Sequence, residues 1–361
     1  MPISGNKGEW SEIYVLFKLL GDGIIYAGDA QMIKIPDVFY PILSVIRQEE
    51  KHLYKYNPNT TEERIVSIVQ DEEEVLRIPM SKFSEFAEKL LTELKDKKKT
   101  RAFSLPEIET YMNDTYCHTL KAKSVDKADI RIVIHDLRTG MTPRLGFSIK
   151  SQLGQPSTLL NAGTTTHFIF RIDGSVITEE FIDSVNSIES QNERMKAIFD
   201  NGGELVYDSM ECQTFEDNLV VIDTCLPRIL GELLIECYKT GHTRLLDIVN
   251  DMSARNVFNV RKPNIYYKAK IVSLLVDAAL GMTPAKPWER KYDANGGYLV
   301  VRKDGEILCY HFYDRNQLED YLLTNTRLEF ASRERYEYGK IYWGKDLKVY
   351  IKLNLQIRFI Q

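Results

Sequence analysis

The chain has 361 residues, of which 43% are hydrophobic and 27% are charged, and it carries a formal net charge of −5. This composition is ordinary for a globular protein with a sizeable core, and the negative charge excludes a protein coated uniformly with basic side chains. No apolar run approaches the roughly 20 residues that cross a membrane. The five cysteines are scattered, which is typical of reduced thiols, so we expect a cytoplasmic protein with no membrane partner.

Charge is distributed unevenly along the chain. Residues 121–150 contain seven basic and three acidic side chains, and residues 327–361 contain eight and four. Residues 179–217 carry eleven acidic side chains against two basic ones. Charge runs usually mark solvated faces, so this distribution does not by itself identify a partner.

The first part of the chain predicts two long helices separated by a mixed region. Apolar residues recur at helical spacing over 8–23 and again over 81–100, and a shorter helix is expected after Pro106. Gly21 supplies a stop signal for the first helix. Residues 31–80 are mixed, with short apolar stretches around an acidic turn.

A period of two begins at residue 128. Residues 128–137 and 145–152 alternate around a turn, which predicts an antiparallel hairpin, and residues 167–174 predict a third strand. Helical patterns follow at 177–187, 192–203, 218–241 with an interruption at Pro227, and 268–282. Strand patterns return at 296–313, which contains an Asp-Gly hairpin signal, and at 344–360.

These elements predict an α+β or α/β protein with a mixed β-sheet core flanked by helices. We expect three consecutive parts: residues 1–180 with the N-terminal helices, a mostly helical segment at 181–285, and a β-rich part at 286–361.

Lys150 lies in the second strand of the predicted hairpin and shares a face with Ser148 and Gln152. Asp129 opens the neighbouring strand, so a carboxylate and an ammonium group can converge on one edge of the sheet. Such a pair suits phosphodiester hydrolysis, because a carboxylate binds Mg²⁺ and an ammonium group offsets charge on the phosphate. Spacing alone favours an ordinary surface Asp–Lys pair, so both interpretations stay open at this point.

The motif KADIRIVI, with eighteen residues between its aspartate and the later SIK, resembles the PD-(D/E)xK nuclease core. Three blocks along the chain are similar, in the same order, to the HpaII family of type II restriction endonucleases: GEWSEIYVLFKLLGDGIIYAGD, LGFSIKSQLGQPSTLLNAGTTTHFIF and YIKLNLQIRF. The resemblance implies a restriction-endonuclease-like fold with additional helical and C-terminal β-rich DNA-binding parts. It also implies Mg²⁺-dependent, site-specific cleavage of double-stranded DNA at a short CCGG-type palindrome.

The resemblance further implies catalytic roles for Asp129, Lys150, Glu12 and Gln152. The generic core carries an acid two residues before its lysine, whereas this chain has Ser148, so the metal site lacks one carboxylate. Glu12 is expected to supply it from the first helix, with Asp129 as the second Mg²⁺ ligand. Glu9 is the weaker candidate, and Gln152 lies on the correct face to ligate through its amide. Without the resemblance, Glu9 and Glu12 are equally a pair favoured by the helix dipole.

Two segments offer groups suited to DNA binding. Arginine suits guanine because its fork reaches O6 and N7 together, and residues 324–345 are the densest region of such groups. We expect DNA contacts from Arg327, Ser332, Arg333, Arg335 and Asn325, and from Asn161, which follows the catalytic strand. Both segments could equally be solvated loops with ordinary turn and cap residues.

Three activities remain open from the sequence. The leading one is a site-specific endonuclease, the second a repair nuclease that recognises DNA structure, and the third a DNA-binding protein whose incomplete metal site leaves it inactive. A palindromic site is most simply cut by two chains related by a two-fold axis, so we expect a homodimer on DNA.

Overall fold

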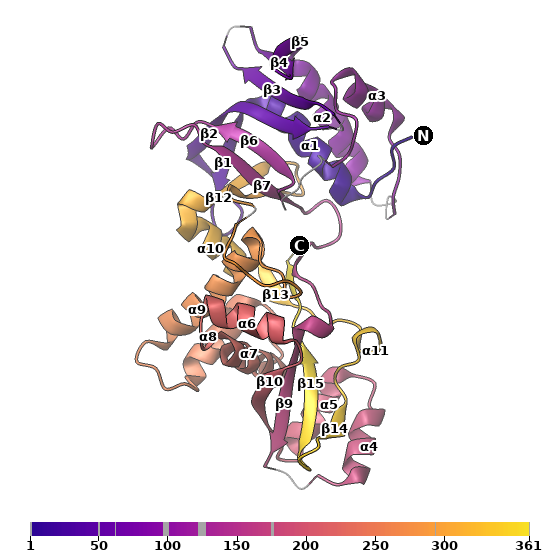
Figure 1. Cartoon of the computed structure of the whole chain (residues 1–361), viewed down its shortest axis with the longest axis vertical. Helices are drawn as coiled ribbons and strands as arrows, with labels where there is room; N and C mark the ends of the chain where they lie inside the picture. Colours follow the sequence, from indigo (N-terminus) through magenta and orange to yellow (C-terminus); the bar gives the residue numbers. More distant parts are fainter. Residues whose placement is uncertain are drawn as a thin grey trace. The chain divides into compact units, whose positions relative to one another are not determined.

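The computed structural model describes residues 2–49, 51–61, 63–96, 101–121, 128–174, 177–292 and 294–360. The chain divides into two compact units (Figure 1). Unit 1 comprises Met1–Ser157, Tyr292–Tyr321 and Gln361, and unit 2 comprises Thr158–Lys291 and Leu322–Ile360. These bounds differ from the three consecutive parts expected from the sequence, because residues 292–321 return to unit 1. No helix in the described ranges is long and apolar enough to span a membrane.

Unit 1 is built on a nine-stranded sheet with the strand order β1-β12-β11-β7-β6-β2-β3-β4-β5. The strands are β1 (Ile24–Gly28), β2 (Lys34–Gln48), β3 (Leu53–Asn59), β4 (Ile65–Gln70), β5 (Glu73–Pro79), β6 (Ile130–Ile134), β7 (Arg144–Ser151), β11 (Gly297–Val301) and β12 (Ile307–His311). β1 runs parallel to β12, and β11 parallel to β7, whereas the other pairs are antiparallel. The expected mixed sheet is therefore confirmed.

Three helices belong to unit 1: α1 (Lys7–Asp22), α2 (Met80–Lys95) and α3 (Pro106–Asp114). α1 begins at a reciprocal cap between Asn6 and Glu9 and ends at Gly23, whose φ of 71° is the left-handed conformation that glycine adopts without strain. The last helical residue, Asp22, thus lies one residue beyond the predicted stop at Gly21. Part of the second predicted helix, residues 97–100, lies outside the described residues.

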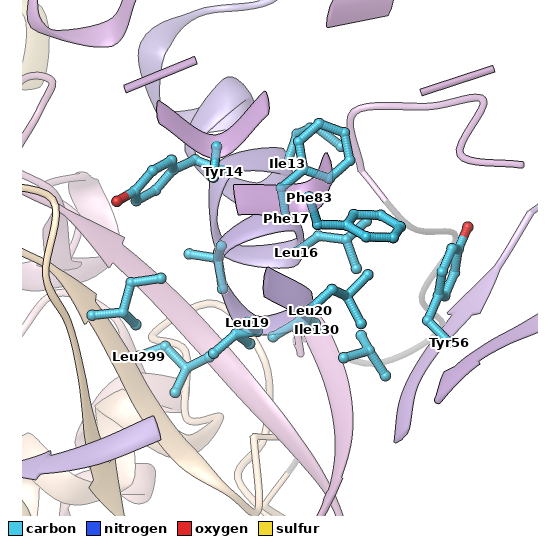
Figure 2. Close-up of a cluster of buried hydrophobic side chains, with 14 of the residues drawn as sticks. Ile13, Tyr14, Leu16, Phe17, Leu19, Leu20, Tyr56, Phe83, Ile130 and Leu299 are labelled. Atoms are coloured by element: carbon cyan, nitrogen blue, oxygen red, sulfur yellow. The ribbon is translucent and has the colours of Figure 1, made fainter. Parts of the chain in front are cut away.

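The core of unit 1 lies between these helices and the sheet. The apolar residues that recur at helical spacing in the first helix are all fully buried, namely Trp10, Ile13, Phe17 and Leu20. Figure 2 shows side chains of α1 gathered with Phe83 of α2, Tyr56 of β3, Ile130 of β6 and Leu299 of β11. Because α1 contributes many large apolar side chains to this cluster, its position is fixed against the strands that carry the predicted site.

Unit 2 contains two smaller sheets. A four-stranded sheet has the order β10-β9-β15-β14, and a three-stranded sheet has the order β13-β16-β8. Their strands are β8 (Thr158–Leu160), β9 (His167–Asp173), β10 (Glu204–Met210), β13 (Thr326–Leu328), β14 (Ile341–Trp343), β15 (Val349–Asn354) and β16 (Ile357–Phe359).

Most of the helices follow one another in unit 2. They are α4 (Glu179–Ser187), α5 (Gln191–Asp200), α6 (Gln213–Ile222), α7 (Leu226–Thr240), α8 (Leu245–Arg255), α9 (Pro263–Leu280) and α11 (Arg333–Tyr336), while α10 (Arg315–Thr324) crosses the division between the units. The interruption predicted at Pro227 is confirmed, because α6 ends at Ile222 and Pro227 lies in the first turn of α7, where its missing N–H costs nothing.

Candidate active site

Asp129 immediately precedes β6 and reaches across to β7. Its backbone N–H donates to the carbonyl of Phe147 at 2.9 Å. Its carboxylate oxygen Oδ2 accepts hydrogen bonds from the backbone N–H of Ile149 at 2.7 Å and from the hydroxyl of Ser148 at 3.0 Å. The aspartate therefore extends the β6–β7 ladder with its side chain, which fixes the direction of the carboxylate.

Lys150 is held next to this carboxylate by Ser148. Its Nζ donates to the Ser148 hydroxyl at 3.2 Å and lies 4.9 Å from the centre of the Tyr298 ring, which β11 brings alongside. Burial lowers the pKa of Lys150, and the nearby negative charges of Asp129 and Glu12 oppose that effect. The serine that replaces the expected acid thus links the lysine to the aspartate.

Glu12 approaches from α1. Burial raises its pKa to about 8, the charge of Asp129 adds to the effect, and Lys121 and Arg47 counteract it. Glu9, one turn earlier, has a different task, because its Oε2 accepts from the backbone N–H of Asn6 at 2.8 Å and caps the helix. Glu9 therefore has a structural role at the start of α1, although it lines the same cavity as Glu12.

One cavity of about 670 Å³ collects these groups. Its lining residues are Asn6, Lys7, Gly8, Glu9, Glu12, Lys121, Asp129, Ile149, Lys150, Ser151, Leu153, Gly154, Gln155 and Ser157. Three of the predicted catalytic residues are thus brought together within unit 1.

The fourth predicted catalytic residue, Gln152, is not brought to this cavity. β7 ends at Ser151, so the alternation of faces does not continue, and the Gln152 amide donates to the sulfur of Met32 at 3.3 Å. The cavity also contains two lysines that the sequence did not single out. Lys121 opens the basic segment 121–150, which was a usable signal, whereas nothing in the local pattern marked Lys7.

Within the described ranges, no group of three His, Cys, Asp or Glu side chains is arranged to hold a metal ion. Glu12 and Asp129 nevertheless fit a hard divalent cation, because they supply oxygen donors to one cavity, and their mutual repulsion adds to the burial that raises the pKa of Glu12. A cation between the two carboxylates would relieve that repulsion.

The predicted DNA-contacting residues all lie in unit 2. Arg327 is half-buried in β13, Ser332 caps α11, and Asn161 is exposed just after β8. Arg333 donates from Nη2 to the carbonyl of Glu189, and the Arg335 guanidinium lies 5.2 Å from the centre of the Tyr336 ring. Asn325 is only 7% exposed, which leaves it little surface for a ligand.

The chain is similar to known restriction enzymes along almost its full length. The model of the HpaII restriction endonuclease family matches residues 6–359. The chain is 44% identical over 359 residues to "Type II restriction enzyme HpaII" of Haemophilus parainfluenzae, and the alignment covers 99% of each chain. No solved structure matches the chain.

Proposed function

The chain belongs to the HpaII restriction endonuclease family, and from this membership and its cavity we propose that it hydrolyses phosphodiester bonds of double-stranded DNA with Mg²⁺ at a short CCGG-type palindrome. The family membership identifies a site-specific nuclease. The observation that carries the chemical proposal is the convergence of Glu12, Asp129 and Lys150 in one cavity. The mixed sheet with α1 against it supports a restriction-endonuclease-like core.

Each charged residue of the cavity has a distinct role in this proposal. Glu12 and Asp129 would hold Mg²⁺, and the bound ion would polarise the phosphate. Lys150 places its ammonium group where negative charge builds on the phosphate during attack by water. Ser148 orients Lys150 by accepting its hydrogen bond, and it orients Asp129 by donating one.

Incubation of plasmid DNA with the protein and Mg²⁺ tests the proposal. Discrete fragments with a common end sequence would support site-specific cleavage. Nicking or a smear would instead indicate the structure-specific repair nuclease, and intact plasmid with a gel shift would indicate an inactive DNA-binding protein. End sequencing of the fragments gives the bases recognised and the position of the cut.

Substitution of the cavity residues tests the assignment of the site. We expect Lys150→Ala and Asp129→Ala to abolish cleavage and to leave binding of the cognate duplex largely intact, because neither side chain has a base-reading role in the proposal. Lys55→Ala is a matched control, since Lys55 lies in the same sheet and pairs with Glu72 at 2.6 Å. Near-wild-type cleavage by either cavity variant would reject the assignment.

A further inference from the structure

Three arginines lie side by side across the small sheet of unit 2. Arg244 forms an antiparallel bridge with Arg327 of β13, and Arg327 is paired in register with Arg358 of β16. Arg358 is in turn opposite Thr158 of β8. Residues directly opposite each other on neighbouring strands lie on the same face of a sheet, about 4.5–5.5 Å apart. We call Arg244, Arg327 and Arg358 the arginine row.

The arginine row occupies the open face of this sheet. The side chains of Arg327 and Arg358 are 42% and 30% exposed, and Arg244 is also exposed. Their neighbours along the two strands point to the other face and are nearly fully buried, namely Thr326, Leu328, Ile357 and Phe359. The alternation therefore places the three arginines on one partly exposed face of the sheet, with the Nε atoms of Arg327 and Arg358 covered by protein.

Within the described residues, Glu329 is the acid paired with the two strand arginines. Its Oε2 lies 3.6 Å from Nη2 of Arg327 and 3.2 Å from Nε of Arg358. Neither contact has hydrogen-bond geometry, and Glu329 Oε2 has no hydrogen-bond partner in the described part of the chain. The three arginines therefore carry more positive charge than the one carboxylate offsets, and some of their polar groups stay unsatisfied. This arrangement costs stability, because like charges directly opposite each other destabilise a sheet.

We propose that the arginine row and Glu329 read G·C base pairs of the target duplex. This inference rests on the proposed function and assigns the base-reading surface to residues of which the sequence indicated only Arg327. Guanine presents two acceptors in the major groove, which suit an arginine fork, and cytosine presents an amino donor, which suits a glutamate.

The presence of Glu329 beside the arginine row indicates that the row binds base edges and not the phosphate backbone. A row that bound only phosphates would gain nothing from Glu329, which repels a phosphate and lies between two of the arginines. The other predicted readers are less suited to this role, because Arg333 is engaged by the carbonyl of Glu189 and α11 is four residues long.

The test compares equilibrium binding to two duplexes of equal length without metal. One carries the site that the wild-type protein cuts, and the other carries random sequence. Arg358→Lys keeps the charge but removes the fork, so we expect it to lower the ratio of cognate to random affinity by about 5- to 150-fold while random binding changes little. Arg244→Ala and Glu329→Gln should also lower that ratio.

Arg171→Ala is the matched control. Arg171 is also a strand arginine of unit 2, but Asp173 binds its guanidinium through two hydrogen bonds of 2.6 Å. We expect an unchanged ratio for this variant. Equal losses on both duplexes for the row variants, with a salt dependence reduced by about one phosphate contact, would overturn base reading. Wild-type affinity of the row variants for both duplexes would show that the row does not contact DNA and would overturn the inference altogether.

The two proposals fail in distinguishable ways. If wild-type protein with Mg²⁺ yields no discrete fragments, the proposed function fails, and the base-reading inference fails with it. If wild-type protein cuts at one sequence and the row variants discriminate as wild type does, only the inference fails. Arg358→Lys conserves charge and approximate size, so it still tests the inference should Arg244→Ala not fold.

Discussion

The hydroxyl of Ser148 connects the two charged groups that the proposed chemistry needs, since it accepts from Lys150 and donates to Asp129. We expect Ser148→Ala to slow single-turnover cleavage by about 10- to 100-fold, as loss of a group that orients metal ligands does elsewhere. Ser44→Ala is the control, because Ser44 is buried in the same sheet and its hydroxyl has no partner among the described residues. Wild-type rates for Ser148→Ala would show that the link is dispensable.

His311 gives unit 1 a sensitivity to acid. Its ring is 1% exposed, its Nδ1 accepts from the backbone N–H of Tyr313 at 2.9 Å, and burial lowers its pKa to about 4. The unfolded chain protonates this residue near its ordinary pKa of about 6.5, so between these values the unfolded state binds more protons. The free energy of unfolding should therefore fall by up to about 3 kcal/mol as the pH drops through this window.

Urea unfolding between pH 4 and 7 measures this loss. His311→Asn keeps an acceptor but cannot titrate, so it should lose less stability than the wild type as the pH drops through this window. His118→Asn, at an exposed position, should leave the dependence as it is in the wild type. A His311→Asn protein that loses stability as steeply as the wild type would contradict the assignment to His311.

At the scale of elements, α1 carries two glutamates with separate tasks. Glu12→Gln should reduce the rate of cleavage in Mg²⁺ by on the order of 100-fold, because loss of a metal ligand should cost at least as much as loss of a group that only orients a ligand. Mn²⁺ should restore part of the activity. The thermal midpoint of the metal-free protein should rise. A neutral amide avoids the cost of burying a negative charge and the repulsion by Asp129, which together raise the pKa of Glu12. Glu9→Gln is the control and should cleave normally. Full activity of Glu12→Gln in Mg²⁺ would leave Glu12 a structural residue.

Elements with a strong local period could be predicted from the sequence. The helix α1, the β6–β7 hairpin and the β11–β12 hairpin all follow such patterns and are confirmed. The four strands β2–β5 were missed, and β2 shows why: its exposed beginning and buried end do not alternate regularly. Strand β6 is also shorter than predicted, since it ends at Ile134.

The candidate site was predictable only in part, for a related reason. Asp129 immediately precedes β6 and Lys150 lies on β7, and the two strands form one hairpin, so the convergence of these residues follows from local pairing. Tyr298 reaches Lys150 through a parallel pairing between β7 and β11, which are more than a hundred residues apart, and no local pattern reports such a contact. The arginine row depends on a similar long-range pairing, and the sequence indicated only one of its three members.

At the scale of the whole molecule, we expect two chains on each cognate duplex. A palindrome is most simply cut by two centres related by a two-fold axis, and no heptad pattern in the sequence offers a coiled-coil interface for free dimers. Sedimentation should therefore show monomers without DNA and two chains per duplex with it. One chain per duplex at saturating protein would instead indicate sequential nicking of the two strands.

The passage of the chain from unit 1 to unit 2 and back has a consequence for synthesis on the ribosome. The nine-stranded sheet lacks β11 and β12 until residue 311 has been made, and the arginine row is complete only at residue 358. Proteins are made from the N terminus. If synthesis stops before residue 297, the released chain therefore lacks β11 and β12 and cannot complete the nine-stranded sheet. Such an incomplete chain is expected to cleave no DNA, because β11 is the strand that pairs with β7, which carries Lys150.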